Sequence, residues 1–532
     1  MSLIKEINKR RTFAIISHPD AGKTTITEKL LLYGGAINLA GTVKAKKSKK
    51  FATSDWMELE KKRGISVTSS VMAFPYQGHD INLIDTPGHQ DFSEDTYRTL
   101  TAVDSVLMLL DAANGVEEQT IKLFKVCRLR KTPIMAFVNK MDRPGKDPFS
   151  LLEEVEKVLE TNTFAMNWPI GMGDEFRGVY DRLNRKVLIY HNQQDRSHKA
   201  ELDGLSLDDP ILEEKLGKEI VQQVREEIEL LDLAGNDFDL DDYLQGELVP
   251  VFFGSALNSF GVEPLLDNIT KIAPAPQARK TTTRIVEPHE EKFTSFIFKI
   301  QANMDPSHRD RVAYMRICSG KFERGMKAFN VRLKRAMRLG RPTQFMAKDR
   351  SLVDKAYPGD IVGIHDPGIY KIGDTFCNEH NPISFVGIPT FAPEHFYLVQ
   401  LDEPLKSKQL NKALDQLSEE GAVQVFRPVN SNQQYLGVVG TLQIDVVKFR
   451  IKAEYGVEVS MKALPYRAAR WVTSSNQKSL SKFLEEQSHN ICLDLYKKPT
   501  LLLDHDWRLK FHQERNPDLL FSATNELLDS SS

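Results

Sequence analysis

The residues best suited to phosphate chemistry lie in a short loop near the start of the chain. Residues 12–16 are β-forming, and residues 24–32 have the pattern of a helix. Backbone N–H groups at the start of a helix bind phosphate oxygens, and this strand–loop–helix order is the context that a phosphate-binding loop requires. The residues predicted to form the loop are Ser17, His18, Pro19, Asp20, Ala21, Gly22, Lys23, Thr24 and Thr25.

Two side chains of this loop have defined roles in the prediction. Lys23 neutralises β- and γ-phosphate oxygens, and the hydroxyl of Thr24 ligates Mg²⁺. Ser17 stands where the common pattern GxxxxGK[ST] has glycine. A small residue can replace that glycine if its φ stays negative.

A second segment follows a strand predicted over residues 80–85. A carboxylate at the end of this strand can hold Mg²⁺ through water, and Gly88 lets the backbone approach a γ-phosphate closely. His89 follows this glycine, and a histidine in such a place is in isolation more often exposed polar surface than a catalytic group. The segment predicted to face the phosphates is Asp85, Thr86, Pro87, Gly88 and His89.

A third segment points to guanine. The apolar strand predicted over residues 133–138 ends in Asn139, Lys140, Met141 and Asp142. The carboxylate of Asp142 can accept hydrogen bonds from guanine N1–H and N2–H together, whereas adenine would leave it unpaired. The stem of Lys140 can lie over the base, and Asn139 can tie this loop to the phosphate loop.

A fourth segment follows the strand predicted over residues 249–254. It consists of Ser255, Ala256 and Leu257, and its backbone N–H groups could meet guanine O6. The four segments together predict a domain that binds GTP and GDP with Mg²⁺ and hydrolyses GTP. A metabolic ATPase or kinase is the less favoured reading, because guanine selectivity has no purpose there.

The segment from Gly41 to Ser70 lies between the first two motifs. It contains the basic run Lys44 to Lys50, and such a density of lysine resists burial. Two interpretations stay open: a solvated loop, or a switch loop that becomes ordered with GTP and contacts RNA phosphates.

Composition narrows the remaining possibilities. The 532 residues predict about two to four domains. No apolar run is long enough for a membrane span, and the first residues are too polar for a signal peptide. The four cysteines form no CxxC pair, which favours buried thiols in a reducing cytosol. A net charge of −2 gives no general nucleic-acid signature.

The pattern predicts a multidomain protein with three domains. Residues 1–278 are expected to form the α/β P-loop GTPase domain, and residues 290–384 a β-barrel with short strands and Gly and Pro turns. Residues 385–532 are expected to form an α+β domain, because the order β-α-β-β-α-β over residues 396–461 is the split βαβ (ferredoxin-like) plan. Arg332, Lys334 and Arg338 are predicted to share one face of a strand in the barrel.

The motifs closely resemble those of the translation-factor GTPases of the elongation factor G and Tu type. The resemblance rests on the loop of residues 17–24, on Arg63-Gly64-Ile65-Ser66, on the segment 85–89 and on the segment 139–142, and it is strongest up to about residue 275. It implies that His89 positions the attacking water once the ribosome docks. Ser66 falls where relatives have a threonine that closes on Mg²⁺, with Thr68 as a rival ligand.

Residues 54–58 and 85–98 resemble most closely the members of this family that act in translation termination. The resemblance implies a ribosome-dependent GTPase that stimulates release and recycling of the stop-codon-reading release factors. Its partners would be the ribosome, through rRNA and ribosomal proteins, and functionally those factors, with no membrane. It also implies a cytoplasmic monomer. An elongation- or translocation-like GTPase and a tRNA carrier are the alternatives, although a carrier would need a second barrel after Leu405.

Overall fold

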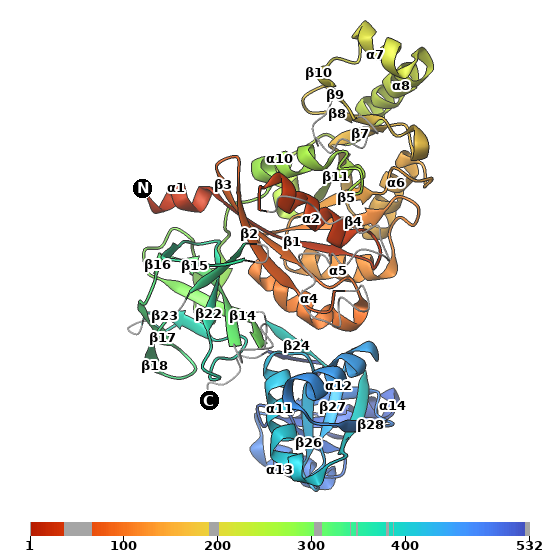
Figure 1. The fold of residues 1–532 in the computed structure, drawn as a ribbon. Helices are drawn as coiled ribbons and strands as arrows, with labels where there is room; N and C mark the ends of the chain where they lie inside the picture. The colour runs from red at the N-terminus through yellow and green to blue at the C-terminus, as the bar shows by residue number, and fades with distance from the viewer. Residues whose placement is uncertain are drawn as a thin grey trace.

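The computed structural model describes residues 2–36, 66–190, 202–302, 311–340, 342–346, 349–378, 382–386 and 388–526. Three folded parts follow one another along the chain, and Figure 1 shows the α/β part in red to yellow-green, the barrel in green and the C-terminal part in blue. The switch-loop interpretation of the lysine run, with Arg63 to Ile65, falls on residues outside the described ones.

The α/β part is built on a seven-stranded sheet in the order β2-β3-β1-β4-β5-β11-β6. Every neighbouring pair is parallel except β2 and β3. The central strands are continuous apolar runs, as expected where helices cover both faces of a sheet. The strands are β1 (Arg10–Ser17), β2 (Ser70–Tyr76), β3 (His79–Asp85), β4 (Ser105–Asp111), β5 (Ile134–Asn139), β6 (Asn162–Ala165) and β11 (Leu248–Phe253).

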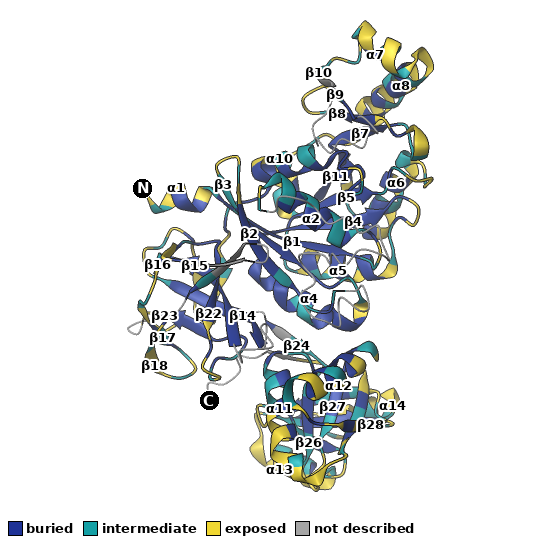
Figure 2. Cartoon of the chain, in the orientation of Figure 1, coloured by how far each residue is buried: buried dark blue, intermediate teal, exposed yellow. Residues whose placement is uncertain are grey.

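Two apolar cores lie on the two faces of this sheet. One core takes side chains from α2 (Lys23–Tyr33) and α10 (Val262–Ile272), and the other from α5 (Glu118–Leu129) and α6 (Pro148–Leu159). Figure 2 shows the sheet as a continuous buried layer between these helices. The remaining helices of this part are α1 (Leu3–Asn8), α4 (Ser93–Thr99) and the short 3₁₀ turns η1 (Gln90–Phe92), η2 (Leu100–Ala102) and η3 (Gly173–Glu175).

An elaboration between β6 and β11 carries a small antiparallel sheet that sequence reasoning missed. Its strand order is β10-β9-β8-β7. Asp209 caps α7 by accepting a hydrogen bond from Ile211 N at 3.0 Å, with Pro210 at the first helical position. The elements are β7 (Asn167–Ile170), β8 (Gly178–Asp181), β9 (Lys186–Ile189), β10 (Leu202–Leu205), α7 (Pro210–Leu216), α8 (Lys218–Ala234) and α9 (Leu240–Gln245).

The second part is a curled antiparallel sheet, which confirms the predicted barrel. Its strand order is β18-β17-β23-β14-β15-β22-β19-β20. The strands are β14 (Thr294–Ala302), β15 (Arg311–Ser319), β17 (Lys327–Asn330), β18 (Arg335–Arg338), β19 (Thr343–Met346), β20 (Asp349–Leu352), β22 (Ile361–His365) and β23 (Thr375–Cys377). Short pairs flank the sheet: β12 (Arg279–Lys280) with β13 (Ile285–Val286), and β16 (Phe322–Glu323) with β21 (Lys355–Ala356).

The predicted basic strand over residues 331–341 is wrong. Residues 331–334 form the turn of a hairpin between β17 and β18, and Lys334 has a φ of 50°. Arg332 turns back onto the barrel, where its Nη2 donates to Asp374 Oδ2 at 2.8 Å. The even spacing therefore spans a turn, and the three basic side chains do not share a strand face.

The C-terminal part confirms the split βαβ plan. Its first half has the sheet order β28-β25-β27-β26, with two helices between the strands. The elements are β25 (His395–Leu401), the 3₁₀ turn η4 (Pro404–Lys406), α11 (Ser407–Glu419), β26 (Gln424–Pro428), β27 (Tyr435–Val438), α12 (Leu442–Tyr455) and β28 (Val459–Ala463). Outside this sheet, β24 (Pro389–Phe391) pairs with β33 (Thr524–Glu526).

A second β-α-β-β-α-β unit follows the first, and sequence reasoning did not find it. The sheet continues from β26 as β30-β31-β29-β32, so the two units join edge to edge between β26 and β30. In each unit the strand at the joint is the second of its four. The elements are β29 (Ala468–Thr473), α13 (Gln477–Glu486), β30 (Ile491–Leu493), β31 (Pro499–Leu503), α14 (Asp506–Arg515) and β32 (Leu520–Ser522).

Candidate functional site

The loop between β1 and α2 has the backbone of a tight anion-binding turn. Asp20 has a φ of 65° and Gly22 a φ of 95°, and Gly22 is the N-cap residue of α2. Ser17 ends β1 and is not among the residues with positive φ, so it meets the condition for replacing glycine. Ser17 is buried, and its Oγ has no hydrogen-bond partner within the described residues.

An ion pair connects the phosphate loop to the end of β3. Lys23 Nζ lies 2.6 Å from Asp85 Oδ1, and both side chains are almost fully buried. Thr86 Oγ1 donates to Ile15 O at 2.7 Å, which fixes the segment after β3 to β1. A Cβ added to Gly88 would lie 3.6 Å from the Cα of Pro19, so the two backbone segments run close together.

His89 lies at the start of η1, and its side chain is 35% exposed. Its Nδ1 accepts a hydrogen bond from Asp91 N at 3.2 Å and lies 3.3 Å from Asp91 Oδ1. Nearby, His18 Nε2 lies 3.4 Å from Glu117 Oε1. The imidazole of His89 is therefore partly accessible and is held by the residue two positions later.

Asn139 connects three of the predicted segments. Its Nδ2 donates to Ala21 O at 2.8 Å, and its Oδ1 accepts from Ala256 N at 2.8 Å. A Cβ on Gly22 would come within 2.3 Å of Asn139 Nδ2, so glycine is required where this amide crosses the phosphate loop. The structure thus brings the ends of β1, β5 and β11 to one edge of the sheet.

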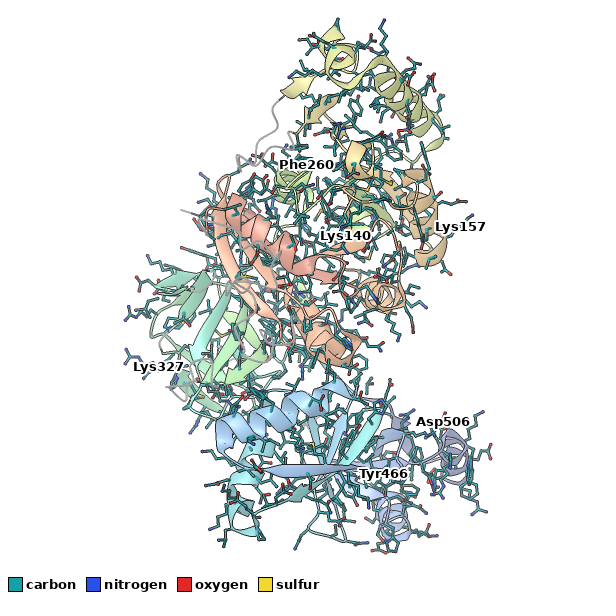
Figure 3. The ribbon with its side chains drawn as sticks, turned by 45° about the vertical axis from the view of Figure 1, so that its right-hand side comes forward. Lys140, Lys157, Phe260, Lys327, Tyr466 and Asp506 are labelled. Carbon is teal, nitrogen blue, oxygen red and sulfur yellow. The ribbon has the colours of Figure 1, made fainter. Side chains whose placement is uncertain are left out.

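Asp142 offers an acceptor suited to a base. Oδ1 of Asp142 is buried and has no hydrogen-bond partner among the described residues, which leaves an acceptor for a ligand N–H group. Met141 N donates to Gly254 O at 3.1 Å. Lys140 has a φ of 69°, and its Nζ lies 2.7 Å from Asp111 Oδ2. Lys140 is labelled in Figure 3, within the α/β part and far from the C-terminal part.

Sequence reasoning missed two carboxylates of this region. Asp111 ends β4, and the rule that ligand-binding residues follow the carboxyl ends of parallel strands could have found it. Asp91 carried no such signal, because its partners come from its own turn and from a distant part of the chain. The two candidate switch-loop ligands, Ser66 and Thr68, are half-buried and precede β2.

Each of the three folded parts matches the model of a known family. The elongation factor Tu GTP-binding domain matches residues 8–275, and elongation factor G domain 2 matches residues 292–379. The C-terminal domain of class II release factor RF3 matches residues 385–513. The fold, the guanine-type loop and these matches define a translational GTPase.

Relatives that match the whole chain show which family of translational GTPases it belongs to. Peptide chain release factor 3 of Symbiobacterium thermophilum is 53% identical over 525 residues, which cover 98% of this chain and 99% of the relative. A crystal structure of a Thermus thermophilus protein has a TM-score of 0.69 and 26% identity, over 88% of this chain and 71% of its own. This chain belongs to the family of peptide chain release factor 3, and it is a GTPase of translation termination. Within the described residues, no helix is long and apolar enough to cross a bilayer.

Proposed function

We propose that the protein is a ribosome-dependent GTPase that stimulates release and recycling of the stop-codon-reading release factors. The observation that carries the proposal is the convergence of a phosphate loop and a guanine-type loop, in a chain whose last domain is of the release factor type. We propose that it acts as a monomer in the cytoplasm. Four buried free thiols suit that reducing compartment.

The GTP-binding residues in this proposal come from the ends of β1, β3, β5 and β11. The phosphate loop wraps the β-phosphate, Lys23 exchanges its ion pair with Asp85 for phosphate oxygens, and Asp142 accepts from guanine. The buried free oxygen of Asp142 supports the last assignment. The proposed set is Ser17, His18, Pro19, Asp20, Ala21, Gly22, Lys23, Thr24, Thr25, Asp85, Thr86, Pro87, Gly88, His89, Asn139, Lys140, Met141, Asp142, Ser255, Ala256 and Leu257.

The residues present also fit a magnesium ion. Oδ2 of Asp85 is buried without a hydrogen-bond partner in the described part of the chain, and Thr24 places a hydroxyl in the first turn of α2. A bound Mg²⁺ would neutralise charge that builds up on the phosphoryl oxygens during transfer. Thr24 and Asp85 would hold it, and Ser66 or Thr68 would close over it from the segment before β2.

We propose His89 as the residue that orients the attacking water. His89→Ala removes the imidazole without touching the phosphate loop, so GTP affinity is expected to stay the same while hydrolysis on ribosomes falls by about 10²-fold or more. Nucleotide binding is measured with a fluorescent GDP analogue and turnover with purified ribosomes. A variant that hydrolyses GTP at the natural rate on ribosomes would show that His89 does not position the water.

The termination role is tested on ribosomes halted at a stop codon with a labelled release factor. Addition of this protein with GTP is expected to accelerate dissociation of the labelled factor, because the GTP-bound conformation competes with the bound factor. GDP in place of GTP and the Lys23→Ala variant serve as controls. An unchanged dissociation rate with GTP would assign the protein to another step of translation.

A further inference from the structure

Helix α12 of the C-terminal domain packs on both segments that flank the proposed catalytic site. Val67, Phe92 and Val446 form a small buried cluster, against which Leu442 and Phe449 of the same helix pack. Val67 follows the candidate Mg²⁺ ligand at position 66, and Phe92 lies in the turn after His89. Figure 1 shows α12 on the side of the C-terminal domain that faces α4 of the GTPase domain.

The carboxylate of Asp91 bridges this helix and His89. Oδ2 accepts a hydrogen bond from Leu442 N at 2.7 Å, at the first residue of α12. Oδ1 lies 3.3 Å from Nδ1 of His89, whose imidazole also accepts from Asp91 N. Asp91 is only 7% exposed, so its hydrogen bond from Leu442 N is made in a sheltered environment where a charge-assisted hydrogen bond is strong.

Two glycines of the C-terminal domain make room for side chains of the GTPase domain. A Cβ on Gly440 would lie 1.9 Å from Cγ of Asp91, and a Cβ on Gly421 would lie 1.8 Å from Nη1 of Arg98. Arg98 Nη2 donates to Gly421 O at 2.9 Å. At both glycines the two domains are in close contact. A larger residue at either position would push the C-terminal domain away from the GTPase domain.

We propose that Asp91 is a positioning residue that couples His89 to the docking of α12. The inference rests on the proposed role of His89 in hydrolysis. With α12 docked, Leu442 N holds the carboxylate of Asp91, and this fixes the residue whose backbone N–H holds the imidazole against its own turn. Movement of α12 away from the GTPase domain frees Asp91 and with it His89, so hydrolysis becomes dependent on where the C-terminal domain lies.

Two substitutions break the contact between Asp91 and α12, one in each domain. Asp91→Ala removes the carboxylate. Gly440→Ala adds a methyl group that pushes this carboxylate away from α12, and it changes no residue of the GTPase domain. Either one is expected to raise the kcat of ribosome-free GTP hydrolysis by about threefold or more, with the KM for GTP unchanged, because Asp91 acts on His89 and not on the nucleotide. The double variant is expected to equal the stronger single variant, since both remove one bridge.

Hydrogen exchange at the start of α12 reports docking independently of catalysis. The Leu442 amide donates directly to Asp91, so its exchange is expected to accelerate in both variants. Gly456→Ala is the matched control at the other end of α12. Gly456 has a φ of 66° with no atom within 4 Å of an added Cβ, so alanine strains the helix there without touching Asp91. This control is expected to leave the basal kcat and the exchange of Leu442 unchanged.

The outcomes separate the coupling from the role of His89. Faster exchange at Leu442 with an unchanged or lower basal kcat overturns the coupling, and so does a multiplicative effect in the double variant. A raised kcat that persists when His89→Ala is added overturns the assignment of His89 and, with it, the path through Asp91. A raised kcat that His89→Ala abolishes supports both.

Discussion

Asn139 makes two hydrogen bonds that hold three loops together, to Ala21 O and from Ala256 N. The residue types and spacing were sufficient to predict its link to the phosphate loop, because each motif directly follows an apolar strand. The ion pairs were not predictable in the same way. Lys140 pairs with Asp111 and Lys23 with Asp85, and such pairings depend on strand order in space rather than on sequence spacing.

Replacement of Asp142 tests the predicted selectivity for guanine. Asp142→Asn is expected to weaken GTP binding by about 10²-fold or more, because the amide cannot accept from both guanine N–H groups. Xanthosine triphosphate is expected to bind better, since the new amide can donate to the xanthine carbonyl. Competition between the two nucleotides measures the switch, and Asp237→Asn, which alters an exposed carboxylate of the same domain, is the control. An unchanged base preference would refute the assignment of this loop.

The elements of the GTPase sheet place the motifs, since the carboxyl ends of parallel strands meet at one edge. That made the α/β domain predictable, while the first split βαβ unit was predictable from its order of strand and helix patterns. The second unit was missed although α13 has apolar residues at helical spacing, with Leu480, Phe483 and Leu484 packed in one core. Its strands β30 and β32 are too short to show an alternating pattern. The prediction of one strand over residues 331–341 was wrong for a related reason. The even spacing of basic residues continues through a tight hairpin turn.

Helix α4 joins the GTPase domain to the barrel through a buried ion pair. Asp95 Oδ2 lies 3.2 Å from Lys299 Nζ of β14 and accepts from Ser69 N at 2.6 Å. Burial alone would raise the pKa of Asp95, but the charges of Lys299 and Arg98 with the Ser69 hydrogen bonds hold it below its usual 3.8. An aspartate with a lowered pKa stabilises the fold above its unfolded pKa, and that contribution is lost as the pH falls through its folded pKa.

Asp95→Asn is therefore expected to lower the free energy of unfolding most at neutral pH. The difference from the natural protein should shrink as the pH falls below 3.8, and urea unfolding at a series of pH values measures it. Glu94 is the matched control on the same helix, because burial raises its pKa above 4.5. Glu94→Gln is expected to show the opposite pH dependence of the free energy of unfolding. The natural protein loses stability relative to this variant when the pH rises above 4.5. Parallel pH profiles for the two variants would contradict the assignment.

A buried polar network joins the GTPase domain to the barrel. Arg316 of β15 is 1% exposed and donates to Asp104 Oδ2 and to Gly359 O. Arg279 donates to Asp104 Oδ1 at 2.9 Å, and Arg10 Nε donates to Asp360 Oδ2 at 2.9 Å. The sequence contained no sign of this network, because its members lie on five separate segments whose approach is decided only by domain packing.

Asp104→Asn is expected to destabilise the protein by about 3–5 kcal/mol, because it leaves the guanidinium of Arg316 buried without its counter-charge. Denaturant unfolding measures the loss, and with two arginines facing Asp104 the joint between the domains is the first place to loosen. The control is Asp354→Asn, which breaks the exposed ion pair with Arg324 on the barrel surface and should cost at most about 1 kcal/mol. Replacing Asp104 and Arg316 together by leucine should recover part of the loss, since the more deeply buried of the two arginines is then no longer left without its counter-charge. A loss for Asp104→Asn no larger than for Asp354→Asn would mean that the network does not hold the two domains together.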